Sequence, residues 1–215
     1  MSENQAIQRN IFRMVHIDNL KKILKEGEYS PSYRFDKDYI NIGDELLISQ
    51  RREFRVPIAP GGFLSDYIPF YFGGHSPMLL NIKTGYRGIT QRPQRDIVFI
   101  CAHIESIIKE GLEYVFTDGH AKDRLTSFYN RPEDLGSVNW SAVSRQYWKS
   151  TEENPDLMRQ KQAEFLVKNH IPPICLSGII VHDDESAIKV ERMKEQVGSK
   201  LPVYIDRYYK YYYHD

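Results

Sequence analysis

The stretch QAEFLV, residues 162–167, has the alternation of a short β-strand. Successive strand side chains point to opposite faces of a sheet, so Phe165 and Val167 share one face and Glu164 lies on the other. Short apolar stretches of this kind, separated by Gly, Pro and polar residues, recur along the chain and predict a sheet. The other stretches that predict strands are residues 11–16, 96–102, 114–116, 179–182 and 203–208.

Amphipathic segments between these strands predict helices. Residues 17–26 (IDNLKKILKE) place Leu20, Ile23 and Leu24 on one helical face, and Gly27 ends the pattern. Strands mixed with helices, without a regular βαβ repeat, indicate an α+β fold. No internal repeat or low-complexity linker divides the sequence, so we expect a single domain over residues 1–215. Further helices are predicted at residues 104–110, 139–148 and 184–196.

The composition narrows the class of protein. Hydrophobic residues make up 41% of the chain and charged residues 27%, which excludes a wholly disordered chain, and no apolar run approaches the ~20 residues of a membrane-spanning helix. The chain has 29 Lys and Arg residues and 29 Asp and Glu residues, so its formal net charge is zero. This balance disfavours a broad surface for duplex nucleic acid but is compatible with a local basic cleft. The polar N-terminal stretch lacks the core of a secretion signal, so we expect a cytoplasmic protein with Cys101 and Cys175 reduced and buried.

Glu164 is a carboxylate inside an apolar strand, and two interpretations are open. It is either a solvent-facing residue of an edge strand or a residue of a cleft, and the strand pattern alone favours solvent. The preceding polar segment, residues 149–162, favours the cleft, because Arg159 and Lys161 lie just before the strand. A polar loop that leads into a strand carboxylate is a reasonable way to build a catalytic edge that recognises a substrate.

Other polar groups are open to two interpretations as well. Arg51, Arg52 and Arg55 are either solvated surface charge or include an arginine that holds a pyrophosphate with paired donors. GGHSP at residues 73–77 is either a tight turn or a ligand loop. Walker A, GxGxxG, GxSxG and HExxH motifs are absent from the sequence. The seven histidines and two cysteines lack the spacing of metal ligands, so no metal site is expected.

Four blocks of the sequence stand out. They are HIDNL at residues 16–20, RR through VPxxPGG at residues 51–62, DYIPFYF with SPML at residues 66–79, and QAEFLV. These blocks resemble the DarT toxins, a family of ADP-ribosyltransferases that modify bases in single-stranded DNA. Together they span nearly the whole chain in the family's order, and FTDGH at residues 116–120 is a weaker fifth block.

The resemblance implies an ADP-ribosyltransferase fold, in which two small β-sheets with flanking helices form a central cleft for NAD. It implies transfer of ADP-ribose from NAD to a nucleobase, thymine or guanine, with release of nicotinamide and no metal. An RNA or protein substrate, or an inactive module that only binds single-stranded nucleic acid, remains an alternative. A DarG-like macrodomain antitoxin, or another ADP-ribosyl hydrolase, is the implied partner, and no membrane is expected.

The resemblance also assigns residues. The catalytic glutamate falls on Glu164 and the catalytic arginine on Arg51, with Arg52 as the second choice. Two departures indicate a divergent branch. Residues 73–79 are GGHSPML where members often have PRSPML, and Arg13 and Val15 replace polar residues that contact NAD. The implied NAD contacts are Arg13, His16, Asn19, Leu20, Arg51, Tyr71 and Met78, and the implied substrate contacts are His75, His120, Arg159, Lys161 and Gln162.

The closing segment, YIDRYYKYYYHD, has five tyrosines within residues 208–213. These rings could stack on a nucleic-acid strand. Because chain ends are often poorly ordered, we favour a core strand at residues 203–208 followed by a fraying tail.

Overall fold

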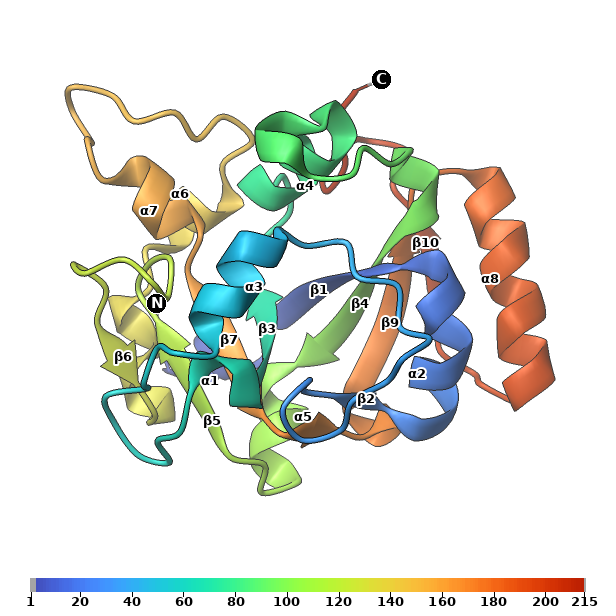
Figure 1. Ribbon diagram of the computed structural model, residues 1–215, viewed down its shortest axis with the longest axis horizontal. Helices are drawn as coiled ribbons and strands as arrows, with labels where there is room; N and C mark the ends of the chain where they lie inside the picture. Colours follow the sequence, from blue (N-terminus) through green and yellow to red (C-terminus); the bar gives the residue numbers. More distant parts are fainter. Residues whose placement is uncertain (1–2, 215) are drawn as a thin grey trace.

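The computed structural model describes residues 3–214, and its centre is a sheet of eight strands in the order β10-β9-β4-β1-β3-β7-β5-β6 (Figure 1). A separate pair, β2 (Glu28–Tyr29) and β8 (His170–Ile171), lies outside this sheet. The strands of the large sheet are β1 (Asn10–His16), β3 (Tyr67–Tyr71), β4 (Ile97–His103), β5 (Tyr114–Thr117), β6 (Phe128–Tyr129), β7 (Glu164–Lys168), β9 (Leu176–Val181) and β10 (Val203–Ile205).

Eight α-helices and six short 3-10 turns connect the strands within residues 3–214. The α-helices are α1 (Glu3–Ile7), α2 (Leu20–Glu26), α3 (Glu45–Arg51), α4 (Pro77–Thr84), α5 (Ile104–Lys109), α6 (Trp140–Ser144), α7 (Leu157–Lys161) and α8 (Asp184–Val197). The 3-10 turns are η1 (Ile17–Asn19), η2 (Leu64–Asp66), η3 (Tyr86–Gly88), η4 (Gln94–Asp96), η5 (Pro132–Ser137) and η6 (Pro173–Cys175).

The large sheet consists of two four-stranded halves. β1 pairs with β4 along its whole length, and β3 pairs with β7 along its whole length. Between the halves, β1 and β3 share only the pair Phe12↔Tyr71. Beyond that pair the backbones of the two strands are not paired with each other, so the sheet opens there. This arrangement agrees with the two small sheets around a cleft that the resemblance implies.

The two faces of the sheet bury different side chains, as strand alternation requires. In β1, Ile11 and Val15 belong to the core under α2 and α8, and Phe12 and Met14 belong to a second core on the opposite face. Both cysteines are buried, as expected. Figure 1 shows α2 and α8 side by side at one end of the molecule. Within residues 3–214 no helix is long and apolar enough to cross a membrane.

Most of the helices and strands predicted from the sequence are present, but they begin or end at other residues than predicted. Residues 17–26 form η1 and α2, residues 162–167 contain the start of β7, and residues 184–196 lie in α8. The helix predicted at residues 139–148 is only α6, because the chain turns extended at Arg145.

The prediction of a fraying C-terminal tail is wrong. After β10 the chain turns back over the sheet, and the buried carboxylate of Asp206 accepts hydrogen bonds from the backbone N–H groups of Lys210, Tyr211 and Tyr212. Tyr212 is fully buried, and its hydroxyl donates to the carbonyl of Ile97 at 2.7 Å. Aromatic burial and satisfied backbone groups therefore hold the tail in place.

Candidate active site

Glu164 lies at the start of β7, an interior strand between β3 and β5. Its side chain is only 3% exposed, so the solvent-facing interpretation of this carboxylate is wrong. Oε1 accepts a hydrogen bond from the backbone N–H of Ala121 at 3.1 Å. The backbone N–H of Glu164 donates to Oγ1 of Thr117 at 3.0 Å. The carboxylate is thus fixed from the side of the segment that follows β5.

Arg51 faces Glu164 from the last turn of α3, a helix that begins where the carboxylate of Asp44 accepts two backbone N–H bonds. Its Nη1 donates to Oε2 of Glu164 at 2.9 Å, whereas the neighbouring Arg52 is exposed. Among the described residues, Nη2 of Arg51 is buried without a hydrogen-bond partner. A buried donor in this state indicates a missing acceptor.

Two aromatic rings surround the pair. Tyr71 is directly opposite Glu164 in the β3–β7 register, and its hydroxyl lies 3.7 Å from Sδ of Met78. Burial, helped by Glu164, raises the pKa of Tyr71, so this phenol stays neutral. Burial lowers the pKa of His120, and the charge of Arg51 lowers it further. The carboxylate of Glu164 acts in the opposite direction and does not outweigh burial. His120 is therefore a neutral imidazole at pH 7, able to donate and accept hydrogen bonds.

Arg13 lies where β1 and β3 separate. Its Nη2 pairs with Glu28 at 2.5 Å and lies 3.4 Å from the Tyr39 hydroxyl, and Nη1 donates to the Pro69 carbonyl. Burial disfavours the charged guanidinium of Arg13 and by itself would lower its pKa. Glu28 and Tyr39 stabilise the charged form more strongly, so the pKa of Arg13 is raised. Sequence reasoning missed Glu28 and Tyr39, because they lie in an irregular segment without a motif.

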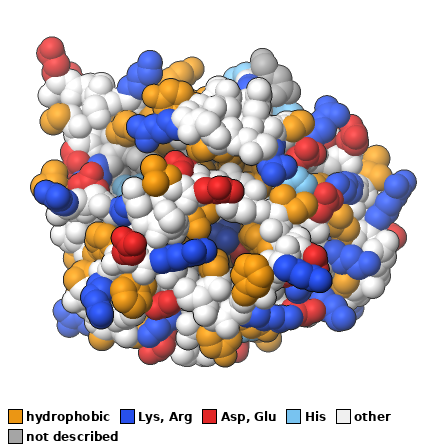
Figure 2. Space-filling view, viewed as in Figure 1, with side chains coloured by type: hydrophobic (Ala, Val, Ile, Leu, Met, Phe, Trp, Pro, Cys, Tyr) orange, Lys and Arg blue, Asp and Glu red, His pale blue; other side chains and the backbone are white. Residues whose placement is uncertain are grey.

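The residues around this opening are suited to an anionic dinucleotide. Nε of Arg13, Oε2 of Glu28 and Nη2 of Arg51 are buried and unpartnered in the described part of the chain. Buried polar groups are rarely left without partners, so donors and an acceptor of this kind fit the phosphates and hydroxyls of NAD. Figure 2 shows a hollow near the centre of this face with a basic side chain at its bottom.

Three residues implied as NAD contacts are buried and contact other parts of the protein. His16 and Asn19 are buried at the end of β1, and Leu20 is fully buried in the core. Nδ1 of His16 accepts the backbone N–H of Asp18, and Asn19 exchanges two hydrogen bonds of 2.9 Å with the backbone of Ile40. The contacts of Asn19 hold the segment that carries Tyr39, a partner of Arg13.

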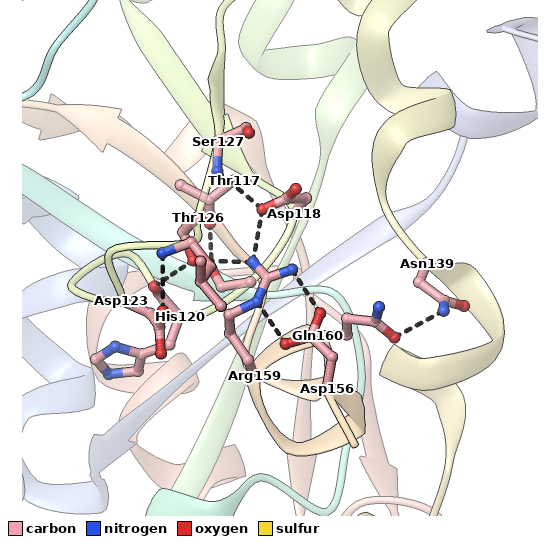
Figure 3. Close-up of polar contacts among 12 residues, drawn as sticks. Thr117, Asp118, His120, Asp123, Thr126, Ser127, Asn139, Asp156, Arg159 and Gln160 are labelled. Atoms are coloured by element: carbon pink, nitrogen blue, oxygen red, sulfur yellow. Dashed lines mark hydrogen bonds and ion pairs between the residues drawn. The ribbon is translucent and has the colours of Figure 1, made fainter. Parts of the chain in front are cut away.

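Arg159 was expected to touch nucleic acid, but all of its nitrogens have partners inside the protein (Figure 3). Nε and Nη2 donate to Asp156 at 2.7 Å each, and Nη1 donates to Asp118 at 2.8 Å and to Thr126 at 3.0 Å. Gly119 passes so close that a Cβ there would lie 2.3 Å from Nη1 of Arg159. The structure therefore places Arg159 as a brace between α7 and the loop that carries His120.

Lys161 and His75 also differ from the expected substrate contacts. The Lys161 ammonium is buried and donates to the carbonyls of Gly74, Val143 and Arg145, and burial lowers its pKa to about 8. His75 is buried, with its ring edge against Tyr213. Both side chains lack access to a strand on the surface because they are enclosed by the protein.

The remaining expected substrate contact, Gln162, is half-buried at the end of α7, and its amide donates to the carbonyl of Met158. Of the expected site residues, the structure thus gathers Arg51, Tyr71, Met78, His120 and Glu164.

Comparisons with known proteins show which family this chain resembles. Residues 12–213 match the family described as ssDNA thymidine ADP-ribosyltransferase, DarT. A DNA ADP-ribosyl transferase of Escherichia coli O127:H6 (strain E2348/69 / EPEC) is 34% identical over 195 residues, 90% of this chain and 89% of that protein. A DNA ADP-ribosyl transferase-DNA ADP-ribosyl glycohydrolase fusion protein of Thermosipho africanus (strain H17ap60334) is 28% identical over 92% of this chain and 48% of the fusion.

Solved structures give the same result. The structure of Thermus sp. 2.9 DarT in complex with ADP-ribosylated ssDNA matches with a TM-score of 0.87 and 31% identity, over 95% of this chain and 97% of that chain. The same protein in complex with NAD+ matches with a TM-score of 0.83 and 31% identity, over 95% and 98% of the two chains. The fold and the relatives are those of an NAD-dependent ADP-ribosyltransferase. The chain belongs to the DarT family.

Proposed function

We propose that this protein transfers ADP-ribose from NAD to a thymine base of single-stranded DNA. The observation that carries the proposal is the Arg51–Glu164 pair, buried beside the β1–β3 opening with one arginine donor unpartnered. The family description names thymidine and single-stranded DNA, and the names of the relatives mention DNA and not RNA.

Glu164 is the residue we assign to the proton transfer. NAD supplies the ADP-ribosyl group, and nicotinamide leaves with the electron pair of the broken glycosidic bond. Thymine has two ring nitrogens, and N1 is already bonded to deoxyribose, so N3 forms the new bond. The N3 proton then passes to the Glu164 carboxylate, which can also accept a hydrogen bond from the ribose. N3 lies on the pairing edge of thymine, which explains why the strand must be single.

Arg51 is the residue we assign to holding the dinucleotide. Its Nη1 keeps Glu164 in place, and its Nη2 is free for a phosphate or ribose oxygen. A guanidinium fixed by a carboxylate loses little freedom on binding, so the ligand is held in one geometry.

Neutral His120 is the residue we assign to the target base. The loop that carries it also donates the Ala121 N–H bond to Glu164, so base contact and carboxylate position are coupled. A neutral imidazole can bond a carbonyl or N–H of thymine without placing a second cation beside Arg51.

We infer that a DNA ADP-ribosyl glycohydrolase of the DarG type reverses the modification. The fusion of the two activities in one Thermosipho protein supports such a partner. Both thiols are buried, as is typical of reduced cysteines in cytoplasmic proteins, which supports a reaction in the cytoplasm.

The test is mass spectrometry of oligonucleotides after incubation with NAD. One single-stranded DNA set contains thymine without guanine, a second contains guanine without thymine, and RNA versions form a third. We expect an ADP-ribose adduct on the thymine set alone. An adduct on guanine or on RNA would overturn the choice of target, and intact NAD with every set would overturn the activity.

A further inference from the structure

The C-terminal segment forms one wall of a groove on the face of the sheet that carries Glu164. The groove has a volume of about 470 Å³. Its floor is formed by Phe12, Cys101, Gly178 and Ile180, from three adjacent strands. We call it the tyrosine groove, because its walls include Tyr204, Tyr208 and Tyr211, together with Lys210.

The floor of the tyrosine groove lies on the same face of the sheet as Glu164. Glu164, Tyr71, Phe12, Cys101 and Gly178 are successive partners across β7, β3, β1, β4 and β9. Directly paired residues point to the same face of a sheet. Strands lie about 4.8 Å apart, which puts Cys101 roughly 14 Å from Glu164. A stacked strand advances ~3.4 Å per phosphate, so a few nucleotides cover this distance.

The wall of the groove is attached to the active-site segment between Tyr71 and Met78. The carbonyl of Tyr211 accepts the backbone N–H of His75 at 3.0 Å, and the Tyr213 hydroxyl donates to the Ser76 carbonyl at 3.1 Å. At Gly74 the two segments come so close that a Cβ would lie 2.4 Å from the Lys210 carbonyl oxygen. The position of the tail is thus set by the active-site loop.

The loop that precedes Glu164 also reaches the tail. Nε2 of Gln146 donates to the carbonyl of Tyr209 at 3.3 Å, and Nε1 of Trp148 donates to the Tyr213 hydroxyl at 3.0 Å. The C-terminal segment therefore contacts this loop and also lines the tyrosine groove.

The exposed groups of the groove suit a nucleotide. Tyr204 and Tyr208 are 57% and 81% exposed, and neither ring stacks on another described ring, so their faces are open to a base. Lys210 is exposed and has no carboxylate partner among residues 3–214, whereas Arg207 pairs with Asp184. The Asp206 carboxylate accepts three backbone N–H groups, so its charge is largely compensated. Aromatic faces beside a free cation are the combination that binds single strands.

We propose that the tyrosine groove binds a flanking nucleotide of the DNA strand whose target base occupies the active site. The flanking base stacks on Tyr208 or Tyr204, and a neighbouring phosphate lies beside Lys210. The proposal rests on the proposed function, because it requires single-stranded DNA as the substrate. It assigns to the C-terminal segment a role in substrate affinity that is separate from the chemistry at Glu164.

The test compares short and long oligonucleotides that contain one thymine. The short one has one flanking nucleotide on each side, and longer ones add six to the 5′ side or to the 3′ side. For the native protein, one of the two extensions should lower KM about ten-fold, with kcat unchanged. Tyr208→Ala combined with Lys210→Gln should abolish that gain and leave the short substrate unaffected. The matched control is Tyr33→Ala combined with Lys25→Gln, another exposed pair far along the chain from the groove.

Two further readouts separate DNA binding from a change in folding. On single strands each lost phosphate contact reduces the slope of log affinity against log salt by about 0.7, so Lys210→Gln alone should lower the slope by that amount. A 5-iodouracil placed in the extension should crosslink to Tyr204 or Tyr208 on irradiation.

The outcomes distinguish the two proposals. If thymine is modified but the length gain survives in the double variant, the groove proposal is wrong and the proposed function stands. If no oligonucleotide is modified, the proposed function fails and the groove proposal fails with it. A groove that instead pairs two copies of the chain would show association in sedimentation that Tyr208→Ala removes, and that result would also overturn it.

Discussion

Two arginines near β7 have the same burial but differ in how many of their donors are hydrogen-bonded. The side chains of Arg51 and Arg159 are each 12% exposed, and each is paired with a carboxylate. Arg51 makes one hydrogen bond, to Glu164, and leaves Nη2 buried without a partner. Arg159 makes four hydrogen bonds, to Asp118, Asp156 and Thr126.

The difference between the two sites lies in hydrogen bonding and not in burial. An unsatisfied buried donor destabilises the free protein unless a ligand supplies an acceptor, so the Arg51 region is prepared for binding. In the Arg159 region the hydrogen bonds to Arg159 lower the pKa of Asp156, as expected for a pair that stabilises the fold. Substitutions in the first region should therefore affect activity, and substitutions in the second should affect stability.

Glu164→Gln should give the largest effect. The amide keeps the size of the carboxylate and removes its charge and its capacity to take a proton, so kcat should fall by about 10³-fold. The Tm should stay close to that of the native protein. ADP-ribosylation of a thymine oligonucleotide and thermal unfolding measure the two quantities. Glu53→Gln, an exposed neighbour of the Arg51 helix, is the control, and full activity in Glu164→Gln would contradict the assignment.

Arg51→Lys should follow, with a loss in kcat/KM of about 10²-fold. A lysine keeps the charge but cannot bond Glu164 and a phosphate oxygen with two fixed donors, so most of the loss should be in KM for NAD. Arg52→Lys, one position along the chain and exposed, should stay within two-fold of the native protein. Equal losses in the two variants would mean that this part of α3 contributes only general charge.

Arg159→Gln tests the second region, where the main effect should be on stability. It leaves two carboxylates without their main donor, so the free energy of unfolding should fall by about 1–3 kcal/mol, measured by urea denaturation. Activity at a temperature where the variant is folded should fall by about ten-fold, through kcat, because His120 and Ala121 lose their brace. Arg131→Gln, in an exposed pair with Asp134, should change stability by less than about 0.5 kcal/mol.

Local patterns in the sequence predicted the elements of this region and not the partners of its side chains. The alternation at residues 162–167 predicted β7, but the burial of Glu164 depends on β3 and β5, which are distant in sequence. Arg159 and Lys161 looked like surface cations, because Asp118 and the carbonyl of Gly74 lie 41 and 87 positions away.

Resemblance to a family supplied what local patterns could not. The spacing of the RR block selected Arg51 over Arg52, and the structure brings Arg51 to Glu164. The tyrosines of the C-terminal segment carried no pattern that indicates packing, so the prediction of a fraying tail was wrong. The position of the segment depends on the backbone N–H groups that donate to the Asp206 carboxylate and on the close approach of Gly74, both of which require the folded chain.

His120 connects the two regions and gives the smallest expected effect. Its ring is close enough to Glu164 and Arg51 for both to influence its pKa, and its backbone N–H donates to the carbonyl of Arg159 at 3.0 Å. Burial lowers the pKa of His120 in the folded protein below 6.5, the ordinary value that it keeps in the unfolded chain. At a pH between the folded and the unfolded pKa, the unfolded chain therefore binds more protons than the folded protein. Stability therefore rises with pH through this window and is lost as the pH falls below about 6.5.

His120→Asn should reduce this acid sensitivity. His16 and His75 also have pKa values lowered by burial, so the variant removes only part of the effect. The difference in Tm between pH 8 and pH 5.5 should shrink by about 2 °C. Measurement of the Tm at pH 8, where all three rings are neutral, separates this change from a general loss of packing. An unchanged pH difference would mean that His120 is already protonated in the folded protein, and the neutral contact proposed between His120 and the target base would then be wrong.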